Sequence, residues 1–489
     1  MSATLISKSK FINGLQCAKL LWTYYNAKEL IPETEASTQA IFDQGHDVGS
    51  LAKQMFPDGI EVGAEVRDLN ETIRLTKTAL KLRQPLFESA FSAEGGYCRT
   101  DILRPAPKDA WDLIEVKSTT GVKDVHLEDL AFQYWVLVKA GLKIRKCYLM
   151  HINSDFVRKG EIDPKKYFTL EDLTEQVVTE AKLVQDKLDD MVKVIGQRKS
   201  PDIKIGPHCN SPYSCPLIEH CWKFLPPHNV FDLYRGGQVG FQLLEQGITA
   251  LRDIPDTFTL TNKQGLQKQV ALSGKPYINK KAIAKFLGEL EYPVNYLDFE
   301  TINTAIPLFD GVSPYQQIPF QFSLHIVKKP GGKAEHIEFL AKGQQDPRPE
   351  FMSKLRESVT NTGSIVAFNA SFELSRMREC CTAMPKYNLW FKLVEDRIVD
   401  LLVPFRSFDY YHPEQHGSAS MKAVLPALTG KGYDDLGIQE GGSASNEFLR
   451  VTFGDVTAKE RQQVRQQLLE YCGRDTEGMI WIVEKLGMV

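Results

Sequence analysis

The sequence predicts an α/β protein in which two large domains, 1–225 and 291–489, flank a small helical connector over 226–290. Strand-like and helix-like segments alternate in both large domains, as in layered α/β folds. The connector has only short helical patterns around a polar stretch. A chain of 489 residues is also longer than one hydrophobic core usually supports.

The first domain is expected to start with helices up to residue 56, where Pro57, Asp58 and Gly59 form a stop signal. Alternating apolar residues then predict two strands within 85–107, joined at Gly95 and Gly96. The other expected elements are helices over 71–82, 127–141 and 170–195 and strands over 111–118 and 146–152.

The second domain is expected to open with three strands in a meander, followed by alternating helices and strands. The expected strands cover 294–302, 320–327, 334–340 and 364–369, and the expected helices cover 351–359, 371–380 and 460–486. No internal repeat relates the two domains.

Composition indicates a globular protein, with 43% apolar and 25% charged residues. The net charge of −3 can conceal a basic groove, so a nucleic-acid partner has to be argued from local sequence. The N-terminus has no apolar signal-peptide region, and no apolar run approaches the length of a membrane span. We therefore expect a cytoplasmic protein without membrane association. The sequence identifies no protein partner.

Four cysteines have a spacing that suggests a shared ligand. Cys209, Cys215 and Cys221 are six residues apart in a polar segment, and Cys17 lies far upstream. Four thiolates suit either zinc or an iron–sulfur cluster. Unligated thiols are the less favoured interpretation because the surrounding polar residues would make a poor core. The total of nine cysteines, without a secretion signal, also disfavours a disulfide framework.

The first acidic group lies on expected strands of the N-terminal domain. Asp101 precedes Glu115 by fourteen residues, and Lys117 follows on the same face of the strand as Glu115. Two carboxylates at neighbouring strand ends can hold the divalent cation that phosphodiester hydrolysis needs, and the lysine can orient water or phosphate. The Glu-x-Lys triplet alone is commonly a chance pattern.

The second acidic group belongs to the C-terminal domain. Asp298 and Glu300 share one face of a strand, Glu373 follows another strand, and Tyr471 and Asp475 lie one helical turn apart. Three or four such carboxylates can hold two metal ions about 3.5–4 Å apart, and a tyrosine can position the attacking water.

Each C-terminal pattern also has a structural interpretation. Asp-x-Glu is common on strands, and Tyr-x-x-x-Asp often marks a solvated helix face. Asp400, in a further expected element of the same domain, is interpreted as a capping or structural residue.

The order of an aspartate, a gap and Glu-x-Lys resembles the PD-(D/E)xK nucleases, specifically their RecB-like branch. The resemblance implies a restriction-endonuclease-like domain with Mg²⁺ or Mn²⁺, in which His46 is a further metal ligand and Glu88 and Gln133 act at the catalytic centre. The sequence departs from this branch where its usual tyrosine would fall at Leu137. We therefore assign no role to the neighbouring Tyr134.

The one-plus-three cysteine arrangement resembles the iron–sulfur RecB-like nucleases, which include CRISPR-associated adaptation exonucleases and helicase-nuclease repair subunits. This resemblance implies a [4Fe–4S] cluster on Cys17, Cys209, Cys215 and Cys221, with zinc as the alternative. The gaps of five residues within the triplet differ from the C-x-x-C spacing common in those families.

The C-terminal group resembles the tyrosine subtype of the DEDD exonucleases, which have an RNase H-like fold. Asp298, Glu300, Glu373 and Asp475 would be metal ligands, and Tyr471 would orient the water. Glu373 departs from the family, which usually has aspartate there.

Together these features resemble bacterial fusions of a RecB-like nuclease and a DEDD-type domain. They imply a metal-dependent nuclease, acting on DNA in repair or defence, with two active sites of which the C-terminal one is a 3′→5′ exonuclease. The alternatives are a nuclease acting on RNA and a nucleic-acid-binding protein with one degenerate site. The 2′-hydroxyl contacts that distinguish RNA from DNA leave no signature in the sequence.

Overall fold

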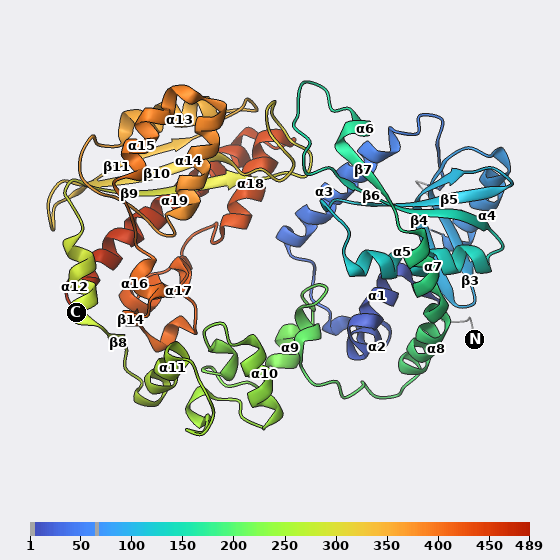
Figure 1. The fold of residues 1–489 in the computed structure, drawn as a ribbon, viewed down its shortest axis with the longest axis horizontal. Helices are drawn as coiled ribbons and strands as arrows, with labels where there is room; N and C mark the ends of the chain where they lie inside the picture. The colour runs from blue at the N-terminus through green and yellow to red at the C-terminus, as the bar shows by residue number, and fades with distance from the viewer. Residues whose placement is uncertain (1–4, 64–67) are drawn as a thin grey trace. The chain divides into compact units, whose positions relative to one another are not determined.

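The computed structural model describes residues 5–63 and 68–489, which form two compact units of mixed α/β structure (Figure 1). The first unit extends to Phe224 and also contains Thr304–Tyr315. The second unit consists of Leu225–Asn303 and Gln316–Val489.

The first unit combines one mixed sheet with helices on both of its faces. Its strands and helices are β1 (Ile6–Ser7), α1 (Lys8–Gln16), α2 (Ala18–Asn26), α3 (Ala36–Lys53), β2 (Ile60–Glu61), α4 (Leu69–Ala79), β3 (Leu86–Ala93), β4 (Gly96–Pro105), β5 (Ala110–Lys117), α5 (Asp124–Lys139), β6 (Lys143–Ile152), α6 (Pro164–Tyr167), β7 (Phe168–Asp172), α7 (Thr174–Glu180), α8 (Val184–Ile195) and α9 (Ile218–Trp222).

In the described part of the first unit, seven strands form a sheet of order β2-β3-β4-β5-β6-β7, and β1 pairs with β4. Strands β3, β4 and β5 are antiparallel neighbours, whereas β5 and β6 are parallel and are connected through α5. A parallel pair requires such a crossover, and its helix lies on one face of the sheet.

Alternating strand residues divide the core of the first unit between the two faces of the sheet. Leu103 and Leu113 pack with α5, α7 and α8, while Ile102 and Ile114 pack with α3. Helix α5 is buried over most of its surface, which explains its long apolar sequence. Side chains with the alternation of Leu113, including Glu115, therefore face α5.

The second unit begins with short helices and continues into a five-stranded sheet. Its strands and helices are α10 (Gly237–Glu245), α11 (Asn262–Ser273), β8 (Tyr277–Ile278), α12 (Lys280–Gly288), β9 (Val294–Ile302), β10 (Ile318–Val327), β11 (Ala334–Leu340), α13 (Arg348–Ser358), β12 (Ile365–Ala367), α14 (Ser371–Ala383), α15 (Asn388–Glu395), β13 (Ile398–Asp400), α16 (Val403–Arg406), β14 (Tyr410–Tyr411), α17 (Met421–Thr429), α18 (Gly441–Phe453) and α19 (Ala458–Leu486).

Within the described residues, the larger sheet of the second unit has the order β11-β10-β9-β12-β13. Strands β11, β10 and β9 form an antiparallel meander, and β12 and β13 continue in parallel beside β9. Phe299 packs against Phe351 of α13 on one face. On the other face, Ser323 hydrogen-bonds to Thr476 of α19. Because residues alternate along a strand, Asp298 and Glu300 face α19.

Most expected strands and helices are present, but three local expectations were wrong. The first helical segment is interrupted at Cys17, whose extended backbone separates α1 from α2. Residues 168–172 form the edge strand β7, paired with β6, instead of beginning the helix expected over 170–195. The N-terminal segment also contains β1, which pairs with β4 about ninety residues later.

The units also differ from the expected domain boundaries. The first boundary lies at Phe224 and Leu225, next to the expected one, but the segment expected as a connector belongs to the second compact unit. The loop between β9 and β10 belongs to the first unit, where Tyr167 donates a hydrogen bond to Ala305 O (2.9 Å) and Arg158 Nη1 donates to Pro307 O (2.7 Å). Such long-range packing leaves no local pattern in the sequence.

None of the helices in the described ranges combines the length and apolar character needed to cross a membrane.

Candidate functional site

The second unit gathers carboxylates from three separate segments. Asp298 and Glu300 come from β9, Glu373 from the first turn of α14, and Asp475 from the middle of α19. Glu300, Glu373 and Asp475 are buried. Thr457 caps the start of helix α19, and the buried side of this helix packs over β9 and β10. This packing places Asp475 beside β9. All four carboxylates expected from the sequence therefore belong to one cluster.

This cluster has strong electrostatic repulsion. Burial and the neighbouring Asp475 raise the pKa values of Asp298 and Glu300 well above their ordinary values. Burial raises the pKa of Glu373 to about 8 and that of Asp475 to about 6. Among the described residues, no lysine or arginine forms an ion pair with these carboxylates, and Lys422 pairs with Glu440 instead (3.6 Å).

The chemistry of this donor set fits divalent cations. One carboxylate oxygen of Glu373 is buried and has no hydrogen-bond partner. Such an oxygen is costly unless a proton or a cation satisfies it. Carboxylate oxygens are also the ligands that Mg²⁺ and Mn²⁺ prefer. The cluster can therefore hold divalent cations.

Two tyrosines border the carboxylates. Tyr433 donates a hydrogen bond to Asp475, and its ring lies 5.9 Å from that of Tyr471. Burial raises the pKa of Tyr471, so its hydroxyl keeps a proton and can act as a hydrogen-bond donor. Tyr433 was missed from the sequence because it lies in a loop far from any strand motif.

Cys472 was also missed as a site residue. Its buried thiol donates to Asp298 Oδ2 across 3.5 Å, and its sulfur lies within 4.8 Å of ligand oxygens of Asp298 and Glu300. Its position next to Tyr471 in α19 was the available signal.

Asp400 has the structural role expected for it. Its Oδ1 accepts hydrogen bonds from the backbone N–H groups of Asn369 (2.9 Å) and Leu402 (3.0 Å). These bonds fix the turns after β12 and β13. The first turn leads into α14 and so positions Glu373.

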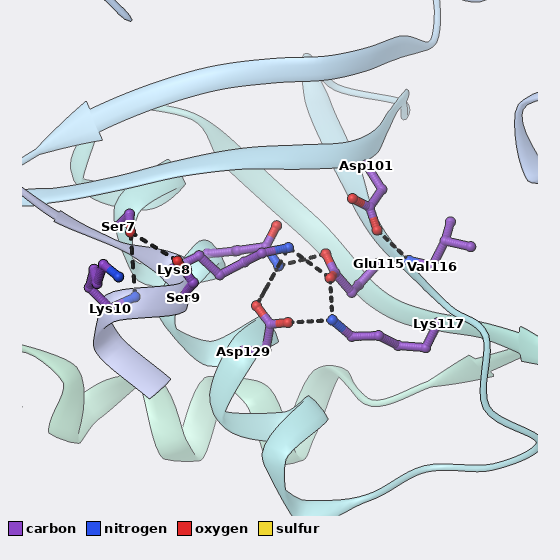
Figure 2. A network of polar contacts seen from close by, with 10 residues as sticks. Ser7, Lys8, Ser9, Lys10, Asp101, Glu115, Val116, Lys117 and Asp129 are labelled. Atoms are coloured by element: carbon purple, nitrogen blue, oxygen red, sulfur yellow. Dashed lines mark hydrogen bonds and ion pairs between the residues drawn. The ribbon is translucent and has the colours of Figure 1, made fainter. Parts of the chain in front are cut away.

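A second polar network lies in the first unit, between β4, β5, α1 and α5 (Figure 2). Asp101 Oδ2 accepts a hydrogen bond from the backbone N–H of Val116 (2.7 Å), which joins the acidic positions of the two strands. Glu115 Oε1 accepts from Lys117 Nζ (2.7 Å). Asp101, Glu115 and Lys117 are therefore brought together.

Helix α5 supplies the other side of this network. Gln133 donates to Glu115 Oε2 (2.7 Å) and also to Asp129 Oδ1 (3.1 Å). Asp129 Oδ2 accepts from Lys117 Nζ (2.6 Å). Gln133 thus lies in the network, as expected. Asp129 was missed, although its spacing of four from Gln133 on one helix face was a signal.

Lys8 is the other residue missed from the sequence. Its Nζ lies 2.8 Å from Glu115 Oε1 and 3.8 Å from Asp129 Oδ1 (Figure 2). The pairing of β1 with β4 and the capping of α1 by Ser7 place this first helical residue beside Glu115. No local pattern could have identified a partner more than one hundred residues away.

The two lysines change the electrostatics of this network. Burial would raise the pKa of Glu115, but Lys117 and Lys8 outweigh it and hold that pKa far below its usual range. Burial and Glu115 raise the pKa of Asp101 to about 7. Three carboxylates therefore face two ammonium groups, and the network is more nearly neutral than the cluster in the second unit.

Two further expected residues, Glu88 and His46, lie on β3 and α3. Glu88 has a positive φ of 54°, and its carboxylate pairs with Lys53 of α3 at 3.5 Å. His46 is exposed on the same helix, which packs on the face of the sheet opposite α5. In the described residues, neither side chain joins the hydrogen-bond network of Glu115. Tyr134 packs at the margin of the apolar core.

The four expected cysteine ligands line one cavity of the first unit. Cys17, Cys209, Cys215 and Cys221 are among the residues that line it. The extended residue Cys17 lies between α1 and α2, and Gln16 donates to His208 O (2.8 Å), which ties this junction to the later segment.

The thiols are suited to a ligand larger than one zinc ion. A zinc ion with four thiolates would bring the sulfur atoms to about 3.8 Å from one another. Among the described residues, no three of these four sulfur atoms all lie within 4.8 Å of one another. The wider arrangement around a cavity fits a polynuclear cluster.

Comparisons with known proteins give similarity without an assigned activity. A family model described as "Domain of unknown function (DUF2779)" matches residues 295–420, which include Asp298, Glu300 and Glu373. The chain is 28% identical over 207 residues to Uncharacterized protein MG366 of Mycoplasma genitalium, covering 38% of this chain. It is 25% identical over 213 residues to the MG366 homolog of Mycoplasma pneumoniae, again covering 38% of this chain. Each match spans 31% of the relative's length.

Proposed function

We propose that this protein is a metal-dependent nuclease that hydrolyses phosphodiester bonds in DNA, with one active site in each compact unit. The observation that carries the proposal is the carboxylate cluster of Asp298, Glu300, Glu373 and Asp475. Its buried negative charge has no ion-pair partner among the described residues. Gathering such groups costs free energy unless cations bind them, which is the arrangement of metal-dependent phosphodiester hydrolysis.

The second unit is proposed to be a 3′→5′ exonuclease. Asp298, Glu300, Glu373 and Asp475 would hold Mg²⁺ or Mn²⁺, which activate water and offset the charge of the transition state. Tyr471 would donate a hydrogen bond to the water or the phosphate, since burial keeps it protonated. The strand order β11-β10-β9-β12-β13 supports an RNase H-like fold for this unit.

The first unit is proposed to be a restriction-endonuclease-like nuclease of the RecB type. Asp101 and Glu115 would hold the metal ion, and Lys117 would orient the water or phosphate. Gln133 supports the orientation of Glu115 through its hydrogen bond to the second carboxylate oxygen. Both oxygens of Glu115 are engaged, so metal binding there requires one of these contacts to rearrange.

A [4Fe–4S] cluster is proposed at Cys17, Cys209, Cys215 and Cys221, with zinc as the alternative. The spacing of the sulfur atoms, wider than around one zinc ion, supports the larger group. The cluster would join the α1–α2 junction to the segment over 209–221. Its proposed role is structural, because metal binding of this kind contributes directly to folding free energy.

The decisive experiment is degradation of end-labelled single- and double-stranded DNA and RNA with Mg²⁺ or Mn²⁺. Wild-type protein should trim DNA stepwise from the 3′ end. Asp298→Asn should abolish trimming, and Tyr471→Phe should slow it because the metal ligands remain. Glu338→Gln, an exposed carboxylate on β11, is the matched control.

The same assay tests the first unit and the choice of substrate. Lys117→Ala should remove cleavage by the first unit and leave 3′ trimming intact, because the two proposed sites share no ligands. Preferential cleavage of RNA would identify RNA, instead of DNA, as the substrate. Binding of strands without cleavage, with either metal, would refute the nuclease proposal.

Nucleic-acid binding without cleavage is a second candidate function for the first unit alone. It is favoured by the position of Lys8, whose ammonium group already compensates Glu115 and Asp129. In that case Asp298→Asn would remove all cleavage and Lys117→Ala would change only affinity.

A further inference from the structure

A second polar group in the second unit lies on none of the elements that carry the acidic cluster. It joins the start of the unit to the segment before α17. His228 precedes the 3₁₀ turn η5 (Val230–Asp232), which ends in Asp232, and His416 directly follows the 3₁₀ turn η8 (Pro413–Gln415). One ligand atom from each of His228, Asp232 and His416 lies within 4.8 Å of the others.

The spacing of this group is compatible with a shared metal ion, although His416 and Asp232 also form a hydrogen bond. His416 Nδ1 and Asp232 Oδ2 are 3.3 Å apart. A charge-assisted hydrogen bond would bring such atoms to about 2.7–2.9 Å. Two ligands on a tetrahedral zinc ion, each about 2.0–2.1 Å from the metal, lie about 3.3 Å apart. The observed distance equals that edge of the tetrahedron.

The two imidazoles are also close together, with a carboxylate beside them. The rings of His228 and His416 stack with centroids 4.9 Å apart and an interplanar angle of 13°. Glu414 lies beside both rings, 3.8 Å from His228 Nε2 and 3.9 Å from His416 Nε2. A carboxylate behind a histidine ligand orients the ring and increases its basicity as a ligand.

The backbone holds these side chains in position without help from an ion. A Cβ at Gly417 would lie 1.8 Å from Asp232 O, and Gly417 has a φ of 77°, so only glycine permits this close approach. Gln267 fixes the same turn by donating to Asp232 O (2.7 Å). Preorganised ligands lower the entropic cost of binding.

We propose that His228, Asp232 and His416 bind a divalent transition-metal ion, with zinc as the preferred occupant and Glu414 as the supporting carboxylate. Two imidazoles and a carboxylate suit zinc, whereas Mg²⁺ prefers oxygen ligands alone. Both histidines are more than a third exposed, so the ion can enter from solvent. The bound ion connects the beginning of the second unit to the loop before α17. This site is independent of the proposed nuclease function.

The test is metal binding by the full-length protein in a large excess of Mg²⁺, which occupies the carboxylate cluster. Zn²⁺ affinity is measured by competition with a chelating dye, and Co²⁺ is used as a spectroscopic substitute. Wild-type protein should bind one Zn²⁺ at this site. His416→Ala should bind it more than about 100-fold more weakly, because loss of an outer carboxylate alone weakens metal affinity by about 10–100-fold. Glu414→Gln should fall within that smaller range.

A gain-of-signal variant protects the test against misfolding. His228→Cys should retain cobalt and add a thiolate-to-cobalt charge-transfer band, which the wild-type difference spectrum lacks. Any contribution from the four cysteines of the first unit is common to all variants and is subtracted. Glu245→Gln, an exposed carboxylate on α10, is the control. Equal Zn²⁺ affinity in wild type and His416→Ala, or no new band in His228→Cys, would overturn the proposal.

Discussion

Glu373 differs from the other carboxylates of its cluster in the length of its side chain and in the state of its oxygens. It lies in the first turn of α14 and is almost fully buried, yet one oxygen has no hydrogen-bond partner. Its carboxylate is close enough to Asp298 and Glu300 to raise their pKa values. If the proposed DEDD-type site is correct, glutamate here stands in for the aspartate usual in that family.

The first prediction concerns this side-chain length. Glu373→Asp should reduce 3′ trimming by about tenfold, equivalent to about 1.4 kcal/mol of transition-state stabilisation. The concentration of Mn²⁺ needed for half-maximal trimming should rise, because the shorter carboxylate reaches the ions less well. Higher activity in Glu373→Asp would instead identify the natural site as degenerate. Asp346→Glu, outside the cluster in an ion pair with Arg348, is a length control.

Lys8 would compete with the metal ion that we propose for the first unit. Its ammonium group contacts Glu115, the residue proposed to hold the cation. We predict that Lys8→Met lowers the Mn²⁺ concentration for half-maximal cleavage about tenfold, or about 1.4 kcal/mol. The same change should cost about 1–3 kcal/mol of unfolding free energy, since a buried carboxylate loses a donor.

A neighbour on the same helix controls for general effects of charge. Lys10 lies over the ring of Tyr24, with Nζ 2.9 Å from the ring centroid, and is outside the contacts of Glu115. Lys10→Met should leave the Mn²⁺ dependence unchanged. If Lys8→Met abolished cleavage at every Mn²⁺ concentration, Lys8 would be a catalytic group instead of a competitor.

At the scale of elements, the approach of carboxylates on α14 and α19 to those on β9 couples stability to pH. Asp475 and Glu373 have pKa values near 6 and 8 in the folded protein, against about 3.9 and 4.3 for unperturbed groups. At pH values between the unfolded and folded pKa values of these groups, the folded state binds more protons than the unfolded state. The metal-free protein should therefore lose stability as pH rises from about 4 to about 8.

This linkage has a measurable consequence for metal binding. The increase in Tm caused by Mn²⁺ should be larger at about pH 8 than at about pH 6, because at the lower pH protons compete for the carboxylates. The double variant Glu373→Gln, Asp475→Asn should weaken that pH dependence, and Asp298 and Glu300, whose pKa values are also raised, should retain the rest. An Mn²⁺ effect that is constant across this range in the wild type would contradict the raised pKa values.

The connection between the α1–α2 junction and the 209–221 segment gives a second prediction at this scale. Cys215→Ser should remove the visible iron–sulfur absorption of anaerobically purified protein and lower the thermal stability, because the cluster joins distant parts of the chain. Cys381→Ser, a buried thiol in the second unit, should keep the colour. Stoichiometric zinc without iron would establish the zinc alternative.

At the scale of the whole molecule, the chain passes between the two units more than once. Thr304–Tyr315 leaves the second unit between β9 and β10 and belongs to the first. Ala305, Phe309 and Val312 in this segment are buried. A fragment 225–489 would carry these apolar side chains without the contacts that the rest of the first unit provides.

This arrangement predicts the behaviour of fragments. Fragment 225–489 should bind a hydrophobic dye and form aggregates in size-exclusion chromatography, because exposed apolar patches promote association. The same fragment with 304–315 replaced by a short Gly/Ser linker should show less of both. Equal dye binding by the two fragments would show that this segment does not depend on the first unit.

Several features of the protein were available from the sequence alone. Alternating apolar residues reflect burial of a sheet face, and this pattern predicted strands β3, β4, β5, β9, β10 and β11. The same periodicity placed Asp298 and Glu300 on one face and Glu115 and Lys117 on another. The grouping of four cysteines was predicted because ligand types have recognisable spacings.

Only the tertiary structure decided which distant side chains complete each group. Lys8 reaches Glu115 through the pairing of β1 with β4, and Tyr433 reaches Asp475 from a loop. It also paired Glu88 with Lys53 and assigned 304–315 to the first unit. Local sequence records the periodicity of each element. Contacts between residues far apart in the chain depend on the packing of whole elements, which no short pattern encodes.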